Sequence, residues 1–211
     1  MKLYSYFRSS ASYRVRIALN LKQLPYDIVP VHLVKGEQHA DEYRNQNPSE
    51  LTPSLQLDDG TVITQSMAIL DYLEAHHPKK PLLPSAHIDR AIVLSMCHII
   101  ACDTHPLNNL RVLRYLSSEL NVSDEQKHAW YAHWIRLNFT ALEQLLLKHG
   151  GQYCFGNTIT MADCLLIPQV YNAKRFKVDL TDFPNILKVA ERCNQLEAFI
   201  QASPEKQVDF E

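Results

Sequence analysis

The chain has 211 residues, of which 46% are hydrophobic and 21% charged, and its formal net charge at pH 7 is -2. This composition is typical of a soluble globular protein with one large domain or two small ones. A nucleic-acid-binding protein would usually be basic. No apolar run approaches the roughly 18 residues of a membrane span, and Arg8 comes too early for a signal peptide. We therefore expect a cytoplasmic protein that binds neither nucleic acid nor a membrane.

The first 80 residues alternate between short strand patterns and helix patterns. In chain order the predicted elements are a strand at 2–7, a helix at 12–22, a strand at 25–33, a hairpin of strands at 54–57 and 61–64, and a helix at 66–77. Pro30 should place the second strand near a sheet edge. Ser66 is the expected N-cap of the last helix. The first three elements begin as a βα unit and the later strands form a hairpin, so the order predicts a mixed sheet.

Prolines at 78, 81 and 84 separate this region from a second one that has helical periodicity throughout. We expect an α/β domain over 1–80, a linker over 81–88 and an all-helical domain over 89–211. A long helix over 89–120 should kink at Pro106. The later predicted features are capping boxes at 123–126 and 160–163, a helix from the first of them to about Lys148, and a helix that begins at Pro184.

The cysteines and histidines show no pattern of metal ligands or disulfides. The five cysteines are Cys97, Cys102, Cys154, Cys164 and Cys193, with no CxxC spacing. They are expected to be small buried side chains without disulfide bonds. We expect no metal site.

The stretch FRSSASYRVRIAL at residues 7–19 places three serines at a predicted helix start. Ser9, Ser10 and Ser12 follow Arg8, and no acidic residue, cysteine or histidine is present. A helix N-terminus offers free N–H groups and about half a positive charge, and hydroxyls add further donors. The stretch therefore predicts an anion site. The alternative is simple capping by Ser10 or Ser12, which alone would explain one serine but not three together with Arg8.

Two further features suit a peptide-like ligand. Pro53 precedes a predicted strand, and a cis Thr52–Pro53 turn would expose the Thr52 backbone to an extended peptide. Gln65 and Ser66 stand at a second helix start, which suits a carboxylate. Taken singly, these features are also explained by a loop proline and a helix cap.

The segments SSASYRVRIAL, NPSELTPSL, QSMAIL.YLE and TMADCLLIPQV resemble the zeta class of the glutathione transferase family. The resemblance extends from Lys2 to about Pro204. It implies a thioredoxin-like α/β N-terminal domain that binds glutathione, an all-α C-terminal domain and a homodimer. Ala11 departs from the family pattern, which usually has cysteine there. Any role of that cysteine is absent from this chain.

The resemblance also implies the site residues. The residues matching glutathione contacts are Ser9, Ser10, Ala11, Gln38, Thr52, Pro53, Gln65, Ser66, His105, Asn109, Leu110 and Arg111, and His39 could take the place of Gln38. The expected substrate contacts are Arg8, His105, Asn108, Arg111 and Arg175. Ser10 is the expected hydroxyl donor to the glutathione thiolate, with Ser9 sharing this catalytic role.

The implied activity is glutathione-dependent cis-trans isomerisation of maleylacetoacetate to fumarylacetoacetate, in tyrosine and phenylalanine breakdown. The thiolate would add to the cis double bond, and rotation and elimination would follow. The segment CDTHPLNNLR at 102–111 looks more like maleylpyruvate isomerases of gentisate breakdown, although a polar kink satisfied by its own neighbours would also account for it. A general glutathione-conjugating transferase and a non-catalytic binding protein on this fold are also compatible with the sequence.

Overall fold

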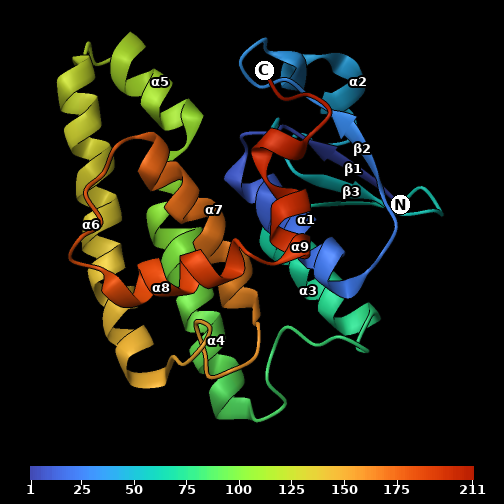
Figure 1. Ribbon diagram of the computed structural model, residues 1–211. Helices are drawn as coiled ribbons and strands as arrows, with labels where there is room; N and C mark the ends of the chain where they lie inside the picture. The colour runs from blue at the N-terminus through green and yellow to red at the C-terminus, as the bar shows by residue number, and fades with distance from the viewer. The chain divides into compact units, whose positions relative to one another are not determined.

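The computed structural model describes all 211 residues, which form two compact units. The first unit comprises Met1–Leu82 and Asn194–Glu211, and the second comprises Leu83–Cys193. The division expected from the sequence differs, because it assigned the last segment to the helical domain. That segment joins the first unit because its helix α9, Glu197–Ala202, packs against α1, Ser10–Lys22 (Figure 1). No helix has the length and apolar character needed to cross a membrane.

The first unit is built on a four-stranded sheet of order β2-β1-β3-β4, and the sheet is mixed, as predicted. Its strands are β1 at Lys2–Ser5, β2 at Asp27–Pro30, β3 at Ser54–Gln56 and β4 at Val62–Thr64. β1 pairs with β2 in parallel, whereas β3 is antiparallel to both β1 and β4. Leu3 lies opposite Ile28 and Leu55 in this register, and Leu3 and Leu55 are fully buried. Pro30 ends an edge strand, where its missing N–H leaves no partner unsatisfied.

Helix α1 begins two residues earlier than predicted. Ser9 is its N-cap, and the Ser9 side chain accepts a hydrogen bond from the backbone N–H of Ser12. The alternative that Ser10 or Ser12 caps the helix is therefore wrong. Val15 and Leu19 are fully buried and attach the helix to the core of the first unit.

Helix α3, Ser66–His76, also has a different cap from the one expected. Gln65 is the N-cap, with a φ of 68°, and Ser66 is the first helical residue. A non-glycine residue rarely adopts positive φ, and such strain is often found at functional sites. Between β2 and β3 the chain forms a 3-10 turn at Glu37–His39 and the short helix α2 at Asp41–Arg44.

The second unit is entirely helical apart from an isolated bridge between two glycines. Its α-helices are α4 at His87–His98, α5 at Leu110–Ser118, α6 at Asp124–His149, α7 at Met161–Arg175 and α8 at Pro184–Cys193. The single kinked helix predicted over 89–120 is wrong. A π-helical segment at Ile99–Thr104 and a 3-10 turn at Pro106–Asn108 separate α4 from α5. Pro106 lacks an N–H and Asn109 caps a new helix, so the chain restarts there instead of bending.

Both predicted capping boxes are confirmed. Ser123 Oγ accepts from Gln126 N at 3.2 Å, while the Gln126 side chain accepts from Ser123 N at 3.0 Å. At the start of α7 the Asp163 carboxylate accepts from the backbone N–H of Thr160 at 2.7 Å and from its hydroxyl at 2.9 Å. Pro184 is the first residue of α8, as expected.

All five cysteines are free thiols, and four of them are buried as expected. Cys102 is exposed, which corrects the expectation for that residue. Burial raises the pKa of the Cys154 and Cys164 thiols well above the usual value. These two thiols are therefore not nucleophiles at neutral pH.

A buried ion pair links α1 to α3 and to the segment that follows α3. Lys22 Nζ at the end of α1 contacts Glu74 Oε2 at 2.8 Å, and the two side chains are only 1% and 8% exposed. The same ammonium donates to the carbonyls of His77 and Lys80, and Glu74 accepts from Leu82 N. One charge pair thus holds α1, α3 and the segment after α3 together.

Removing one partner of this pair should strongly destabilise the first unit. Glu74→Ala leaves the Lys22 ammonium buried without its carboxylate, and we expect a loss of about 3–5 kcal/mol in the free energy of unfolding, measured by urea denaturation. The double variant Lys22→Met/Glu74→Gln should recover most of this loss. The matched control is Asp182→Ala, which breaks the exposed pair with Arg136. Equal losses in Glu74→Ala and Asp182→Ala would contradict the prediction.

Candidate functional site

The start of α1 presents one hydroxyl that is both fixed and accessible. Ser9 N–H donates to Tyr6 O at 2.9 Å and Ser9 Oγ accepts from Ser12 N at 3.2 Å. Ser9 is half-buried, whereas Ser10 is only 4% exposed. Because Ser9 Oγ caps the helix with a lone pair, its own proton is free to donate outward. Ala11 adds no chemistry of its own to this first turn.

The predicted cis peptide bond is present between Thr52 and Pro53. Thr52 is 7% exposed, and its buried hydroxyl has no hydrogen-bond partner. The Thr52 backbone takes part in none of the chain's turn and loop hydrogen bonds. Such unpaired groups directly before β3 suit an added peptide strand.

At the start of α3 a buried cation stands behind the serine. Arg14 Nη1 donates to Ser66 Oγ at 3.3 Å, and Arg14 is only 1% exposed. Gln65 beside it is exposed and has the positive φ described above. A helix N-terminus supported by a guanidinium suits a ligand carboxylate. Arg14 was missing from the predicted site, although its place in SSASYRVRIAL was a signal for it.

The hydrogen bonds within residues 37–50 show which of Gln38 and His39 keeps an acceptor for a ligand. Gln38 is buried, its Nε2 lies 2.9 Å from His39 Nε2, and its Oε1 has no partner. His39 Nδ1 contacts Glu50 Oε2 at 2.5 Å. Hydrogen bonds from His39 and then Arg44 lower the pKa of the Glu50 carboxyl. The unused acceptor in this pair therefore belongs to Gln38.

Arg8 is exposed, but an aromatic residue fixes its direction. Its Nε and Nη2 donate to the Tyr6 hydroxyl at 3.2 and 2.8 Å. Its guanidinium carbon lies 5.0 Å from the centre of the Phe7 ring. A guanidinium held in this way keeps its remaining donors for a ligand. The sequence prediction did not include Tyr6, which carried no motif signal.

In the second unit, the predicted residues other than Arg175 lie between α4 and α5 or in the first turn of α5. Asn109 Oδ1 accepts from Arg111 N at 3.0 Å and so caps α5, while Asn109 Nδ2 lies 3.5 Å from His105 Nε2. Leu110 is the first residue of α5. Arg111 is exposed. A polar kink satisfied by its own neighbours thus accounts for Asn109.

Asn108 contacts Tyr131 directly, and Arg175 lies against Phe176, which stacks on Tyr131. Asn108 Nδ2 donates to Tyr131 O at 3.3 Å, and the buried Asn108 Oδ1 has no partner. The Tyr131 ring stacks on Phe176 at 3.8 Å, and the Arg175 guanidinium lies 4.4 Å from the Phe176 ring centre. Burial raises the pKa of Tyr131, and the charge of Arg175 opposes this. Tyr131 was not among the predicted residues.

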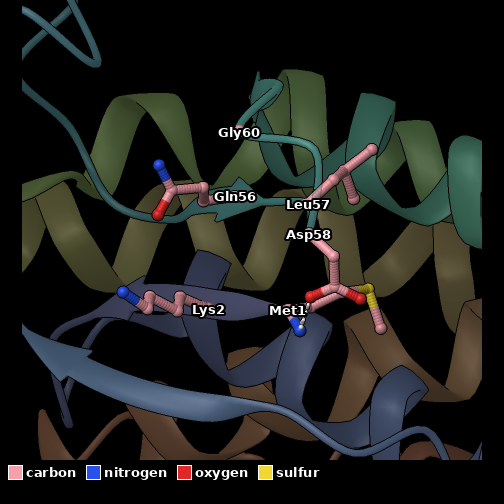
Figure 2. Close-up of a pocket in the computed structure, with 6 residues that line it drawn as sticks. All are labelled: Met1, Lys2, Gln56, Leu57, Asp58 and Gly60. Carbon is pink, nitrogen blue, oxygen red and sulfur yellow. Dashed lines mark hydrogen bonds and ion pairs between the residues drawn. The ribbon is translucent and has the colours of Figure 1, made fainter.

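A shallow hollow of about 270 Å³ lies elsewhere in the first unit, beside β1 and the turn after β3 (Figure 2). Met1, Lys2, Gln56, Leu57, Asp58 and Gly60 line it. The amino group of Met1 pairs with Asp58 at 2.8 Å, and the Asp58 side chain is 90% exposed. None of the predicted site residues lies there, so we place the candidate site at the start of α1 instead.

Two family models cover most of the chain. The glutathione S-transferase N-terminal domain matches residues 8–76, and the C-terminal domain matches residues 111–202. The probable maleylacetoacetate isomerase of Vibrio cholerae serotype O1 is 48% identical over 209 residues, which is 98% of this chain and 97% of that protein.

Two solved structures extend this comparison. A holo maleylpyruvate isomerase, a bacterial zeta-class glutathione S-transferase, superposes with a TM-score of 0.97 at 43% identity, covering 100% of both chains. A maleylacetoacetate isomerase of Anaeromyxobacter dehalogenans 2CP-1, with bound dicarboxyethyl glutathione and citrate in its active site, has a TM-score of 0.89 at 37% identity, covering 100% of this chain and 97% of that one. The expected resemblance is confirmed, and this chain belongs to the glutathione S-transferase family, with zeta-class proteins among its relatives.

Proposed function

We propose that this chain is a glutathione-dependent cis-trans isomerase that converts maleylacetoacetate to fumarylacetoacetate. The observation that carries the proposal is the start of α1, where the capping hydroxyl of Ser9 stands in a first turn that contains no thiol and no acidic side chain. Such a site stabilises an anion brought by a ligand. The names of the isomerases that align over nearly the whole chain support this reading.

The donors and acceptors of the first unit fit the parts of glutathione. The unpaired groups of Thr52 before Pro53 would pair with its peptide backbone, and Ser66 with Arg14 behind it would hold its γ-glutamyl carboxylate. Gln38, with its unused acceptor, would bind the glycine end. When bound, glutathione supplies the thiolate that adds reversibly to the cis double bond and permits rotation to the trans isomer.

The start of α1 must keep that sulfur ionised. A free thiol has a pKa of about 8.5, and lowering it by two units takes roughly 2.7 kcal/mol. A helix dipole contributes about 0.3–1 kcal/mol, up to ~2 when partly buried, and a hydrogen bond to a charged group about 1.5–3 kcal/mol. The dipole with one hydroxyl is therefore sufficient. The resemblance favoured Ser10, but the exposure and cap geometry of Ser9 support Ser9 as the donor.

Cations of the chain would hold the ends of the substrate, which is a dicarboxylate. We assign this role to Arg8 in the first unit and to Arg111 and Arg175 in the second. All three are exposed, and a guanidinium can bind a carboxylate with two parallel hydrogen bonds. His105 and Asn108 are the other proposed substrate contacts. Asn109 and Leu110 stay proposed glutathione contacts.

Maleylpyruvate is the second candidate substrate. The pattern at 102–111 and the likeness to a maleylpyruvate isomerase favour it. Steady-state isomerisation of both substrates, with and without glutathione, tests the proposal and ranks the two by kcat/KM. Retention on glutathione resin with conjugation but no isomerisation would indicate a general transferase. Retention with neither activity would indicate a binding protein. On the family resemblance we also propose a homodimer, and on the composition of the chain a cytoplasmic location.

Replacing the Ser9 hydroxyl should make bound glutathione a weaker acid. If the hydroxyl supplies about 1.5–3 kcal/mol, Ser9→Gly should raise the pKa of the bound thiol by about one to two units. Glycine is the substitution of choice because it keeps most of the capping energy, which alanine would lose. The measurement is a pH titration of the ultraviolet thiolate absorption of bound glutathione.

The control for this titration is Ser10→Ala, which should shift the thiol pKa less than Ser9→Gly. Ser9→Thr retains a hydroxyl and should restore the wild-type titration. A larger shift in Ser10→Ala than in Ser9→Gly would return the role to Ser10. No shift in either variant would leave the backbone N–H groups and the helix dipole as the only source of stabilisation.

Arg175 should act on the substrate and not on glutathione. Removing one charge-assisted contact in Arg175→Ala should raise KM for the dicarboxylate about tenfold, while the KM for glutathione stays nearly unchanged. Lys174→Ala removes the neighbouring exposed cation of α7 and is the matched control. Steady-state kinetics with each ligand varied in turn gives both constants. Equal losses for both ligands would show that Arg175 does not belong to the substrate contacts.

A further inference from the structure

The peptide groups of Phe7 are held by two charged side chains from distant parts of the sequence. The Phe7 N–H donates to Asp209 Oδ2 at 2.9 Å, across 202 residues. The Phe7 carbonyl accepts from Arg16 Nη2 at 3.0 Å. The ring of Phe210, next to Asp209, meets the Phe7 ring edge to face at 5.5 Å. An anion and a cation therefore bind the two sides of one residue, immediately before the start of α1.

Arg16 ties this contact to the rest of the first unit. It is fully buried, and its Nε donates to Ala202 O and its Nη1 to Ser5 Oγ, both at 2.9 Å. Burial lowers the pKa of Arg16 to about 10, and the charge of Asp209 opposes this. Arg16 is therefore still charged at neutral pH. Through Ala202 it also fixes the end of α9, from which the chain continues to Asp209 (Figure 1).

Folding stability alone does not explain why a carboxylate stands at position 209. Its second oxygen, Oδ1, is buried and has no hydrogen-bond partner. A buried carboxylate oxygen without a donor destabilises a fold, and each such group requires an explanation. The contact that Asp209 does make is to the turn in which Ser9 N–H donates to Tyr6 O, which leads directly into the first residues of α1.

We propose that Asp209 is a positioning residue for the thiolate site, which acts by holding the Phe7 N–H while Arg16 holds the Phe7 carbonyl. The two contacts fix the turn from Tyr6 to Ser9, so that the donors at the start of α1 keep one direction toward the sulfur. The inference rests on the proposed function for its consequence, but the contacts themselves do not. Donors that are already oriented stabilise an anion without reorganisation.

A positioning role and a purely electrostatic role predict opposite changes in the thiol pKa when Asp209 is removed, which makes the proposal testable. A carboxylate near a thiolate disfavours the thiolate, so a purely electrostatic role predicts a lower thiol pKa after its removal. A positioning role predicts a higher pKa, because the donors lose their direction. Asp209→Asn removes the charge but keeps an oxygen that can accept from Phe7 N–H. Asp209→Ala removes both.

The first experiment titrates the ultraviolet thiolate absorption of glutathione bound to each variant. We expect Asp209→Ala to raise the thiol pKa by about half a unit to one unit, which is a threefold to tenfold loss of thiolate at neutral pH. Asp209→Asn should stay within a few tenths of the wild type. Glu211→Gln is the matched control in the same segment, because Glu211 pairs with the exposed Lys35 and the buried His32 and makes no hydrogen bond to Phe7. It should leave the titration unchanged.

The second experiment needs no ligand and so separates this inference from the proposed function. Hydrogen exchange of the Phe7 and Ser9 amides, followed by NMR, should accelerate in Asp209→Ala and stay slow in Asp209→Asn and Glu211→Gln. A wild type that binds no glutathione, with faster exchange in Asp209→Ala, would overturn the proposed function and with it the role of Asp209. Unchanged exchange in Asp209→Ala, a lower thiol pKa in both Asp209 variants, or a loss of thermal stability with no change in thiol pKa would each overturn the positioning role.

Discussion

The first unit depends on how the start of α1 satisfies its hydrogen-bond donors. A helix leaves its first N–H groups without intrahelical partners, and here the Ser9 side chain serves only one of them, that of Ser12. The turn before the helix is bound by backbone and buried charge, so the unsatisfied donors and the helix dipole share one direction. The sheet places this turn directly after β1, and the burial of Val15 and Leu19 prevents the helix from rotating away.

Buried charges fix the remaining geometry of this unit. Arg16 bonds to the carbonyl of Ala202, which lies 186 residues further along the chain, and Lys22 bonds to Glu74 at the end of α3. Each would be costly alone, because a buried charge must be paired and hydrogen-bonded. What these charges contribute is a fixed geometry, since a guanidinium with several fixed acceptors allows few arrangements of the backbone around it. The same logic assigns Arg14 to Ser66 at the second helix start.

Local signals in the sequence were sufficient for most elements but not for their long-range relations. Periodicity and capping residues located α6, α7 and α8, and Pro53 indicated the cis turn. The break between α4 and α5 was missed because the apolar period continues through Pro106. The assignment of α9 to the first unit was also missed, because it depends on contacts between residues nearly 190 positions apart. For the site, the same limit hid Tyr6, Tyr131 and Asp209, which occupy no motif and contact the candidate residues or their neighbours only in the folded chain.

Ala11 leaves the start of α1 without a thiol of its own. The resemblance places a cysteine there in most relatives, and a thiol at a helix N-terminus has a lowered pKa. Such a resident thiolate would compete with a ligand's sulfur for the same donors and the same half charge. With alanine, the first turn offers its donors to the incoming sulfur alone, and the thiols of Cys154 and Cys164 in the other unit are buried and protonated. In the proposed function, the start of α1 would therefore hold only the sulfur that glutathione brings.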